Sequence, residues 1–236
     1  MDDNKEQIKL LLLPYAGGSA LFYSRWVKYL SKHIKMVPIE LPGRGMRFKE
    51  ELCDDMSKTI EDIWHQVKAE ITEGRYALFG YCIGTLIVYE LLKKIQKENM
   101  PEPSHCFLCA YPAPDVPRKG KQMKIVNEEE LMEEWINYSN VSRKQLMEKP
   151  YLRSMYEVWK SDCTMIDKYY FSGTKEKFDC NITLVNGTRE QIFSLNELES
   201  WQTFCNKECN SYIVEGKHDF MKTNEKELIQ IINKEI

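Results

Sequence analysis

The pentapeptide Gly-Tyr-Cys-Ile-Gly at residues 80–84 constrains the fold of this chain more than any other sequence feature. It follows an apolar run at 75–79 that predicts a buried strand, and apolar side chains recur at helical spacing over 85–92. A strand, a sharp turn between two glycines and a helix are together typical of a nucleophile elbow. Glycines are favoured because the turn is cramped, and the strained central residue points its side chain into a site. Cys82 is therefore the predicted nucleophile.

Strands and helices are predicted to alternate along the rest of the chain as well. Apolar runs predict strands at 8–13, 34–39, 106–111, 182–185 and 212–214, and helical patterns lie at 22–30, 56–71, 195–204 and 225–236. This alternation predicts a mostly parallel, doubly wound α/β sheet. A length of 236 residues, 43% of them hydrophobic, suffices for a single domain over 1–236. With the elbow, the pattern is that of an α/β-hydrolase.

One predicted connection is much longer than the others. About 70 residues separate the strands at 106–111 and 182–185, far more than an ordinary loop contains. Two apolar stripes at helical spacing, within 131–136 and 152–159, predict helices in this insertion. Ligands of open α/β sheets bind at the carboxyl edge of the strands, so residues 113–180 are expected to form a lid over that edge. The alternative is that these helices only pack against the sheet.

Charge and hydropathy argue against several classes of partner. The formal net charge is −3, and the four histidines and scattered basic residues form no metal-finger or groove-binding pattern. We therefore expect no nucleic-acid partner. The N-terminal residues are too polar for a signal peptide, and no apolar run approaches the ~20 residues of a spanning helix. The protein is expected to be cytoplasmic, to bind no membrane and to be monomeric.

The eight cysteines are expected to be free thiols, because cytosolic thiols are kept reduced. Cys106 and Cys109 lie three residues apart in a predicted strand, which places their side chains on opposite faces. Cys205 and Cys209 could share a helical face, but no second pair or nearby histidine completes a zinc site. No metal site is therefore expected.

The general base is predicted from chain order. A thiol is mostly protonated at pH 7, so Cys82 needs the N-terminus of its helix and a neighbouring imidazolium to form a thiolate. In an α/β-hydrolase the nucleophile, the acid and the histidine follow in that order, and only His105 and His218 follow Cys82. His105 begins a strand, at the end opposite the active edge, whereas His218 comes directly after the last strand. His218 is therefore the predicted base.

The predicted orienting acid is Glu190, and Asp115 is its rival. Each lies beyond the carboxyl end of a predicted strand, and Glu190 stands three residues after the turn glycine Gly187. Either one could be a solvated loop carboxylate. Glu190 is favoured because glutamate is a known variation of the third member of a triad. Asp219 adjoins His218 in the chain, and this adjacency directs its side chain elsewhere.

The oxyanion hole is expected to use the backbone N–H groups of Ile83, directly after the nucleophile, and of Ala16, in the loop after the first strand. Gly17 and Gly18 let this loop approach the site closely. The same glycines could belong to a phosphate-binding loop, but the lysine and the Ser/Thr of a nucleotide-binding loop are absent.

Four motifs in order give the chain a resemblance to the type II thioesterases, the stand-alone editing enzymes of nonribosomal peptide and polyketide synthesis. They are PYAGGS at 14–19, LPGRG at 41–45, FGYCIG at 79–84 and GKHDF at 216–220, with KSD at 160–162 in the insertion. The resemblance extends from the first strand to the last helix. It implies hydrolysis of acyl groups from the phosphopantetheine thiol of an acyl or peptidyl carrier protein, through an acyl-Cys82 intermediate. The resemblance implies no cofactor other than the phosphopantetheine group of the carrier protein.

The sequence departs from that family's usual pattern at three positions. The usual elbow reads Gly-His-Ser-x-Gly, whereas Tyr81 and Cys82 stand here, and Glu190 stands where aspartate is usual. A serine converts a thioester to an oxygen ester, but Cys82 would form a second thioester, which stays activated toward amines and thiols. An acyltransferase or condensing enzyme is therefore the alternative, and a carrier-binding protein without catalysis is a third hypothesis. A cysteine engineered in place of serine would look the same.

Basic residues are expected at the mouth of the predicted site, where we predict that an acidic carrier protein docks. The alternative is a solvated basic loop. The residues concerned are Arg118, Lys119, Lys121 and Lys124, just past the fourth strand, and Arg44 and Arg47, on another loop of the same edge.

Overall fold

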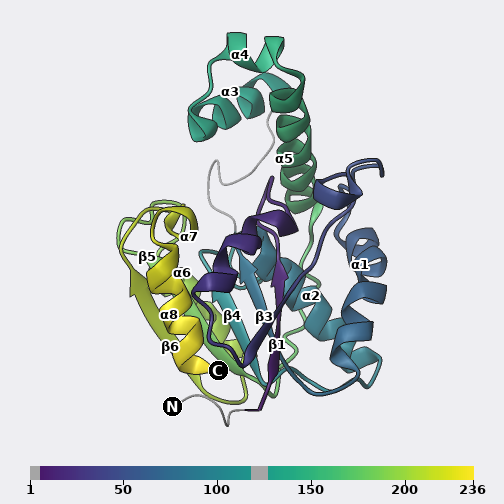
Figure 1. Cartoon of the computed structure of the whole chain (residues 1–236), viewed down its shortest axis with the longest axis vertical. Helices are drawn as coiled ribbons and strands as arrows, with labels where there is room; N and C mark the ends of the chain where they lie inside the picture. Colours follow the sequence, from purple (N-terminus) through teal and green to yellow (C-terminus); the bar gives the residue numbers. More distant parts are fainter. Residues whose placement is uncertain (1–5, 118–126) are drawn as a thin grey trace.

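The computed structural model of the chain describes residues 6–117 and 127–236, and within them six strands form one parallel sheet (Figure 1). The order across the sheet is β2-β1-β3-β4-β5-β6, and every neighbouring pair is parallel. The predicted mostly parallel sheet is therefore confirmed. The strands are β1 (Ile8–Leu13), β2 (Ile34–Pro38), β3 (Arg75–Tyr81), β4 (His105–Cys109), β5 (Asn181–Gly187) and β6 (Cys209–Val214).

The strand order reverses between β1 and β3. The chain runs outward from β1 to β2 and then returns to place β3 on the other side of β1. Ligands of open α/β sheets bind beyond the carboxyl ends of the strands at such a switch point. The loop after β1 and the elbow after β3 therefore meet at the place where this architecture puts a site.

Helices cover both faces of the sheet. α1 (Met56–Ile71) and α2 (Ile83–Lys97) lie on one side, and α8 (Glu225–Glu235) lies on the other (Figure 1). The 3-10 helix η1 (Ala20–Lys28) is next to α8, because Asn233 donates to the carbonyl oxygen of Tyr29 at 2.8 Å. Since both faces are covered, the central strands are largely apolar, and β4 is buried at every residue.

Several short elements complete the framework, and four details of the sequence-based expectations are corrected. The segment 22–30 forms a 3-10 helix, and 195–204 divides into α6 (Leu195–Leu198) and η3 (Glu199–Phe204). β4 ends at Cys109 because Ala110 has a φ of 57°, which leaves the extended conformation. Cys205 follows η3 and Cys209 begins β6, so the idea that they share a helical face is wrong. The remaining elements are η2 (Gly45–Arg47) and α7 (Phe220–Thr223).

The chain between β4 and β5 forms α3 (Glu128–Ser139), α4 (Arg143–Glu148) and α5 (Pro150–Lys168), beyond the carboxyl ends of the strands (Figure 1). These helices have a small apolar cluster of their own, which comprises Trp135, Leu146, Leu152 and Tyr156. The second half of α5 is different, because Met165 and Ile166 belong to the main core. α5 thus connects the inserted helices firmly to the body of the molecule.

Candidate active site

Cys82 stands at a strained turn between β3 and α2. Its φ is 54° and its ψ is −123°, and its backbone N–H donates to the carbonyl oxygen of Cys109 at 2.9 Å. A Cβ atom on Gly80 would lie 2.4 Å from the carbonyl oxygen of Gly84, and one on Gly84 would lie 3.0 Å from that of Leu13. The glycines therefore allow strand and helix to approach closely, and the strained backbone presents the Cys82 thiol at the N-terminus of α2.

His218 and Glu190 come from the loops after β6 and β5. His218 Nδ1 donates to Glu190 Oε2 at 2.7 Å, and the side chain of Glu190 is only 2% exposed. The other carboxylate oxygen of Glu190 accepts from the backbone N–H of Ile192 at 2.7 Å. The side chain of Cys82 is close enough to His218 to raise the pKa of the imidazole. The structure thus brings Cys82, His218 and Glu190 together in a line from thiol to carboxylate.

The electrostatics of this line favour a charged imidazole. Burial by itself lowers the pKa of His218, but hydrogen bonds and charge interactions with Cys82 and Glu190 outweigh burial and raise that pKa to about 10. Burial likewise tends to raise the pKa of Glu190, but its hydrogen bond to His218 lowers it below its ordinary value. An imidazolium next to sulfur favours the thiolate, which is the nucleophilic form of cysteine.

The rival acid lies elsewhere. Asp115 pairs with Lys175, with 2.5 Å between Oδ2 and Nζ, and forms no contact with His218 among the described residues. Asp219 stands at the N-terminus of α7, where its backbone carbonyl accepts from Lys222 and Thr223. The geometry therefore favours Glu190 over both aspartates as the partner of His218.

A cavity of about 410 Å³ opens beside Cys82 and His218, within the range of pockets that bind small ligands. Aromatic, aliphatic and charged side chains line this cavity. The charged Lys222 donates to the hydroxyl of Tyr138, a residue of α3, at 3.0 Å. The inserted helices thus supply part of the cavity wall. Among the lining residues are Tyr15, Tyr81, Tyr138, Trp159, Ile192 and Met221, with Glu134, Asp219 and Lys222 as the charged members.

Ala16 lies in a tight turn at the wall of the same cavity. The turn closes where the N–H of Gly18 donates to the carbonyl oxygen of Tyr15 at 2.7 Å, and Gly17 has a φ of 72°. Ile83 is the first residue of α2, and the first N–H groups of a helix have no partner within the helix. Of the two N–H groups expected to form an oxyanion hole, that of Ala16 therefore lies in the turn after β1, and that of Ile83 lies at the start of α2, directly after Cys82.

Tyr81 is a residue whose role the sequence did not reveal. Its hydroxyl donates to the carbonyl oxygen of His218 at 2.5 Å and accepts from the N–H of Met221 at 3.4 Å. It therefore holds the backbone that carries the imidazole. In the sequence, only the position of Tyr81 indicated a role, because the residue before the nucleophile of an elbow ends a strand beside the site.

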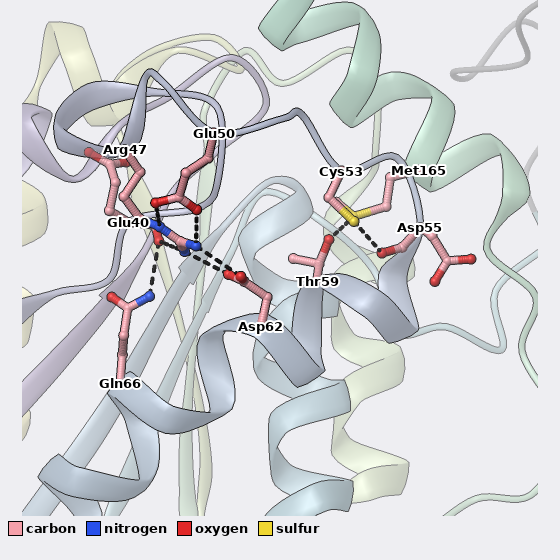
Figure 2. A network of polar contacts seen from close by, with 9 residues as sticks. All are labelled: Glu40, Arg47, Glu50, Cys53, Asp55, Thr59, Asp62, Gln66 and Met165. Carbon is pink, nitrogen blue, oxygen red and sulfur yellow. Dashed lines mark hydrogen bonds and ion pairs between the residues drawn. The ribbon is translucent and has the colours of Figure 1, made fainter.

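One of the predicted docking residues is buried, and another is already paired with acidic side chains. Arg44 is buried, with its side chain 4% exposed, and forms an ion pair with Asp162. Arg47 pairs with Glu50 and with Asp62 of α1 (Figure 2). The expectation for Arg44 is wrong because its guanidinium is needed inside the molecule, and the charge of Arg47 is already compensated. Arg118, Lys119, Lys121 and Lys124 lie outside the described residues.

Two other structural findings concern metal and membrane. Within residues 6–117 and 127–236, no three His, Cys, Asp or Glu side chains are grouped as ligands of a metal ion. Among the helices described, none has the length and apolar character needed to cross a bilayer.

Comparison with known proteins places the chain in a family. Residues 8–236 match the model of the thioesterase domain. The chain is 25% identical over 230 residues to linear gramicidin dehydrogenase LgrE of Brevibacillus parabrevis, covering 96% of this chain and 86% of the relative. It is 26% identical over 231 residues to the medium-chain S-acyl fatty acid synthase thioesterase of Anas platyrhynchos, covering 96% and 91%.

A solved structure gives the same result. ClbQ from the colibactin NRPS/PKS pathway superposes with a TM-score of 0.87 at 26% identity, and the match covers 97% of this chain and 96% of ClbQ. This similarity, together with the family match, confirms the predicted α/β-hydrolase fold. The chain therefore belongs to the thioesterase family, whose members are hydrolases that act on thioesters.

Proposed function

We propose that the protein is a type II thioesterase, which removes acyl groups from the phosphopantetheine thiols of acyl or peptidyl carrier proteins through an acyl-Cys82 intermediate. The observation that carries the proposal is the arrangement of Cys82, His218 and Glu190, in which Cys82 and His218 line a cavity of about 410 Å³ and Glu190 accepts a hydrogen bond from His218. Cysteine, histidine and a buried acid in this order form a nucleophile, a general base and its orienting partner. No metal ion or cofactor of the protein's own takes part in the proposal.

The first half of the reaction transfers the acyl group to sulfur. The Cys82 thiolate attacks the thioester carbonyl carbon, and the negative charge that forms on the carbonyl oxygen is accepted by the N–H groups of Ala16 and Ile83. As the bond from carbon to the pantetheine sulfur breaks, protonated His218 gives its proton to that sulfur. The carrier protein leaves as a free thiol.

Water completes the reaction. His218, now neutral, accepts a proton from a water molecule that attacks the carbonyl carbon of acyl-Cys82. The bond to the Cys82 sulfur then breaks, and the products are a carboxylic acid and the original pair of thiolate and imidazolium. Glu190 keeps Nδ1 of His218 protonated throughout and stabilises the positive charge.

The relatives support a carrier-bound substrate. ClbQ comes from an NRPS/PKS pathway, and the Anas protein is a thioesterase of fatty acid synthase, so both names describe systems that carry acyl chains. A largely apolar, aromatic wall suits an acyl chain and the pantetheine arm, because both bury apolar surface on binding. The inserted helices, as part of that wall, would act as the lid.

Acyl transfer is the second candidate function, and the identity of Cys82 favours it. An acyl-cysteine is a thioester, so the group on Cys82 keeps its activation toward an amine or a thiol. In this alternative the acceptor takes the place of water in the second half of the reaction, and His218 accepts the acceptor's proton.

Intact-mass measurement tests both functions with one substrate. The protein is mixed with an acyl carrier protein loaded with a short acyl group, with and without an added amine or thiol. We expect release of the acid, and an acyl adduct that maps to Cys82. The matched control is Cys53→Ala, because Cys53 is one of the two partly exposed free thiols and lies outside the cavity. An adduct that persists in Cys82→Ala contradicts the proposal, and a product that changes with the acceptor favours transfer.

A further inference from the structure

Arg44 and Asp162 form an ion pair inside the molecule. Arg44 Nη1 and Nη2 donate to the two carboxylate oxygens of Asp162 at 2.7 Å each. The side chains are only 4% and 0% exposed. Arg44 follows β2 and Asp162 belongs to α5, so this paired contact joins the inserted helices to the carboxyl edge of the sheet. Burial of two charges is costly, so such a pair calls for a specific reason.

The same two side chains also hold the turn after β1. Asp162 Oδ2 accepts from the backbone N–H of Gly17 at 2.7 Å, and Arg44 donates to the carbonyl oxygen of Gly18 at 3.3 Å. α5 approaches the turn closely, since a Cβ atom on Gly17 would lie 3.1 Å from Cβ of Trp159. The turn is therefore held at both of its glycines, as well as by its own bond from Gly18 to Tyr15.

These contacts determine which backbone N–H of the turn can bind an oxyanion. Asp162 already takes the N–H of Gly17, so that group cannot also bind an oxyanion. Within residues 6–117 and 127–236, the N–H of Ala16 donates to no other group, and Ala16 lies at the cavity with Cys82. A donor stabilises a developing charge only when it already points to the position of that charge. The orientation of the turn thus decides whether the Ala16 N–H can act.

We propose that Arg44 and Asp162 are positioning residues, which aim the N–H of Ala16 at the oxyanion of the thioester reaction. The inference rests on the proposed function. It adds a role for α5, whose Asp162 holds the turn that carries the Ala16 N–H. Neither side chain touches the substrate. A merely structural pair would affect the melting temperature but not the turnover of the folded enzyme.

The test uses Asp162→Asn in the full-length protein, with two reactions at Cys82. Acylation by a small acyl thioester passes through an oxyanion, whereas alkylation by iodoacetamide displaces iodide and forms none. We expect kcat for the thioester to fall about 10- to 100-fold, with KM within about two-fold of the native value. Alkylation of the Cys82 peptide should keep its native rate, because the thiolate and His218 are unchanged.

Lys168→Met is the matched control. Lys168 also joins α5 to the body through an ion pair, at 2.7 Å from Asp54, but it does not contact the turn. This variant should retain both native rates. Arg44→Lys serves as a second variant in case Asp162→Asn does not fold, since lysine keeps the charge and loses the two-pronged contact. It should lower kcat less than Asp162→Asn, again without an effect on alkylation.

Three results separate the outcomes. Native kcat in folded Asp162→Asn or Arg44→Lys overturns the inference. An equal fall in alkylation and acylation also overturns it, because the variant would then act on the thiolate. Failure of the native protein itself to acylate Cys82 would refute the proposed function instead, and it is seen before any variant is made.

Discussion

Replacement of Glu190 by glutamine tests the line from thiol to carboxylate most directly. The variant keeps the size of the side chain but removes the negative charge that accepts from His218 at 2.7 Å. The carboxylate is 2% exposed, so water cannot take its place. The imidazolium loses its charged partner, and the amide NH₂ group can turn the imidazole toward the wrong tautomer.

The size of the effect follows from that one hydrogen bond. A hydrogen bond to a charged group contributes about 1.5–3 kcal/mol, and each 1.36 kcal/mol corresponds to a factor of ten in rate. We therefore expect kcat/KM for a small acyl thioester to fall roughly 10- to 150-fold. Glu190 helps to raise the pKa of His218 to about 10, so the pKa of His218 is lower in the variant. The fall in activity at alkaline pH, where the imidazolium loses its proton, therefore moves to lower pH.

The same change alters stability in a pH-dependent way. The raised pKa of His218 gives stability that is complete below 6.5, its ordinary value, and is lost as pH rises through about 10. The lowered pKa of Glu190 gives stability that is present above 4.5, its ordinary value, and is lost in acid. The melting temperatures of the native protein and the variant should therefore differ most between pH 4.5 and pH 6.5, where both contributions to stability are present.

Rates and thermal melts from about pH 4 to about pH 11 provide the measurements, because this range includes the pKa of about 10 of native His218. Asp115→Asn is the control, because Asp115 pairs with Lys175 and should leave the rate unchanged. Native activity in Glu190→Gln together with a loss in Asp115→Asn would refute the reasoning and give the acid role to Asp115. If activity fell at the same alkaline pH in Glu190→Gln as in the native protein, the charge of Glu190 would have no effect on the pKa of His218.

Three further predictions concern the elbow and the partner. Gly80→Ala should destabilise the fold by about 1–3 kcal/mol in urea unfolding, because the new Cβ would lie 2.4 Å from a backbone oxygen. Gly74→Ala has open space around the new Cβ but a φ of 77°, so it measures the cost of backbone strain without a clash. Tyr81→Phe should lower kcat roughly 2- to 12-fold through loss of the hydrogen bond to His218, and a change in melting temperature alone would argue against this role. Reversal of charge at Lys119 and Lys121 should raise KM for carrier-bound substrate in a salt-dependent way and spare an acyl cysteamine; equal effects on both would argue against docking.

The sheet and the elbow could be predicted from the sequence because local chemistry determines them. Parallel strands buried on both faces are apolar throughout, so β1, β3 and β4 are visible as apolar runs. The elbow is visible because the backbone approaches closely at both glycines, leaving no room for a Cβ atom at Gly80 and little room at Gly84. Chain order then limited the histidine of the proposed triad to His218 or His105.

The contacts of charged side chains could not be predicted in this way. Arg44 and Asp162 are 118 residues apart, and nothing in the local sequence distinguishes a guanidinium that enters the core from one that faces water. The same limit applied to Asp115, whose partner Lys175 is also remote in the chain. Long-range pairing depends on how the inserted helices pack, and α5 makes the contact that determines the environment of Arg44.

The chemistry of the proposed nucleophile, Cys82, distinguishes the two proposed functions, whereas the geometry of the site does not. The fold, the turn after β1 and the cavity are those of a protein related to thioesterases, and all of them serve hydrolysis and transfer equally well. The difference arises only after acylation, because acyl-Cys82 keeps the activation of a thioester whereas acyl-serine does not. In Cys82→Ser, an enzyme adapted to transfer should lose acceptor-dependent turnover, and water should take a larger share of the remaining activity. Rapid hydrolysis by the native protein, with a product that no amine or thiol alters, would exclude transfer and leave the editing thioesterase.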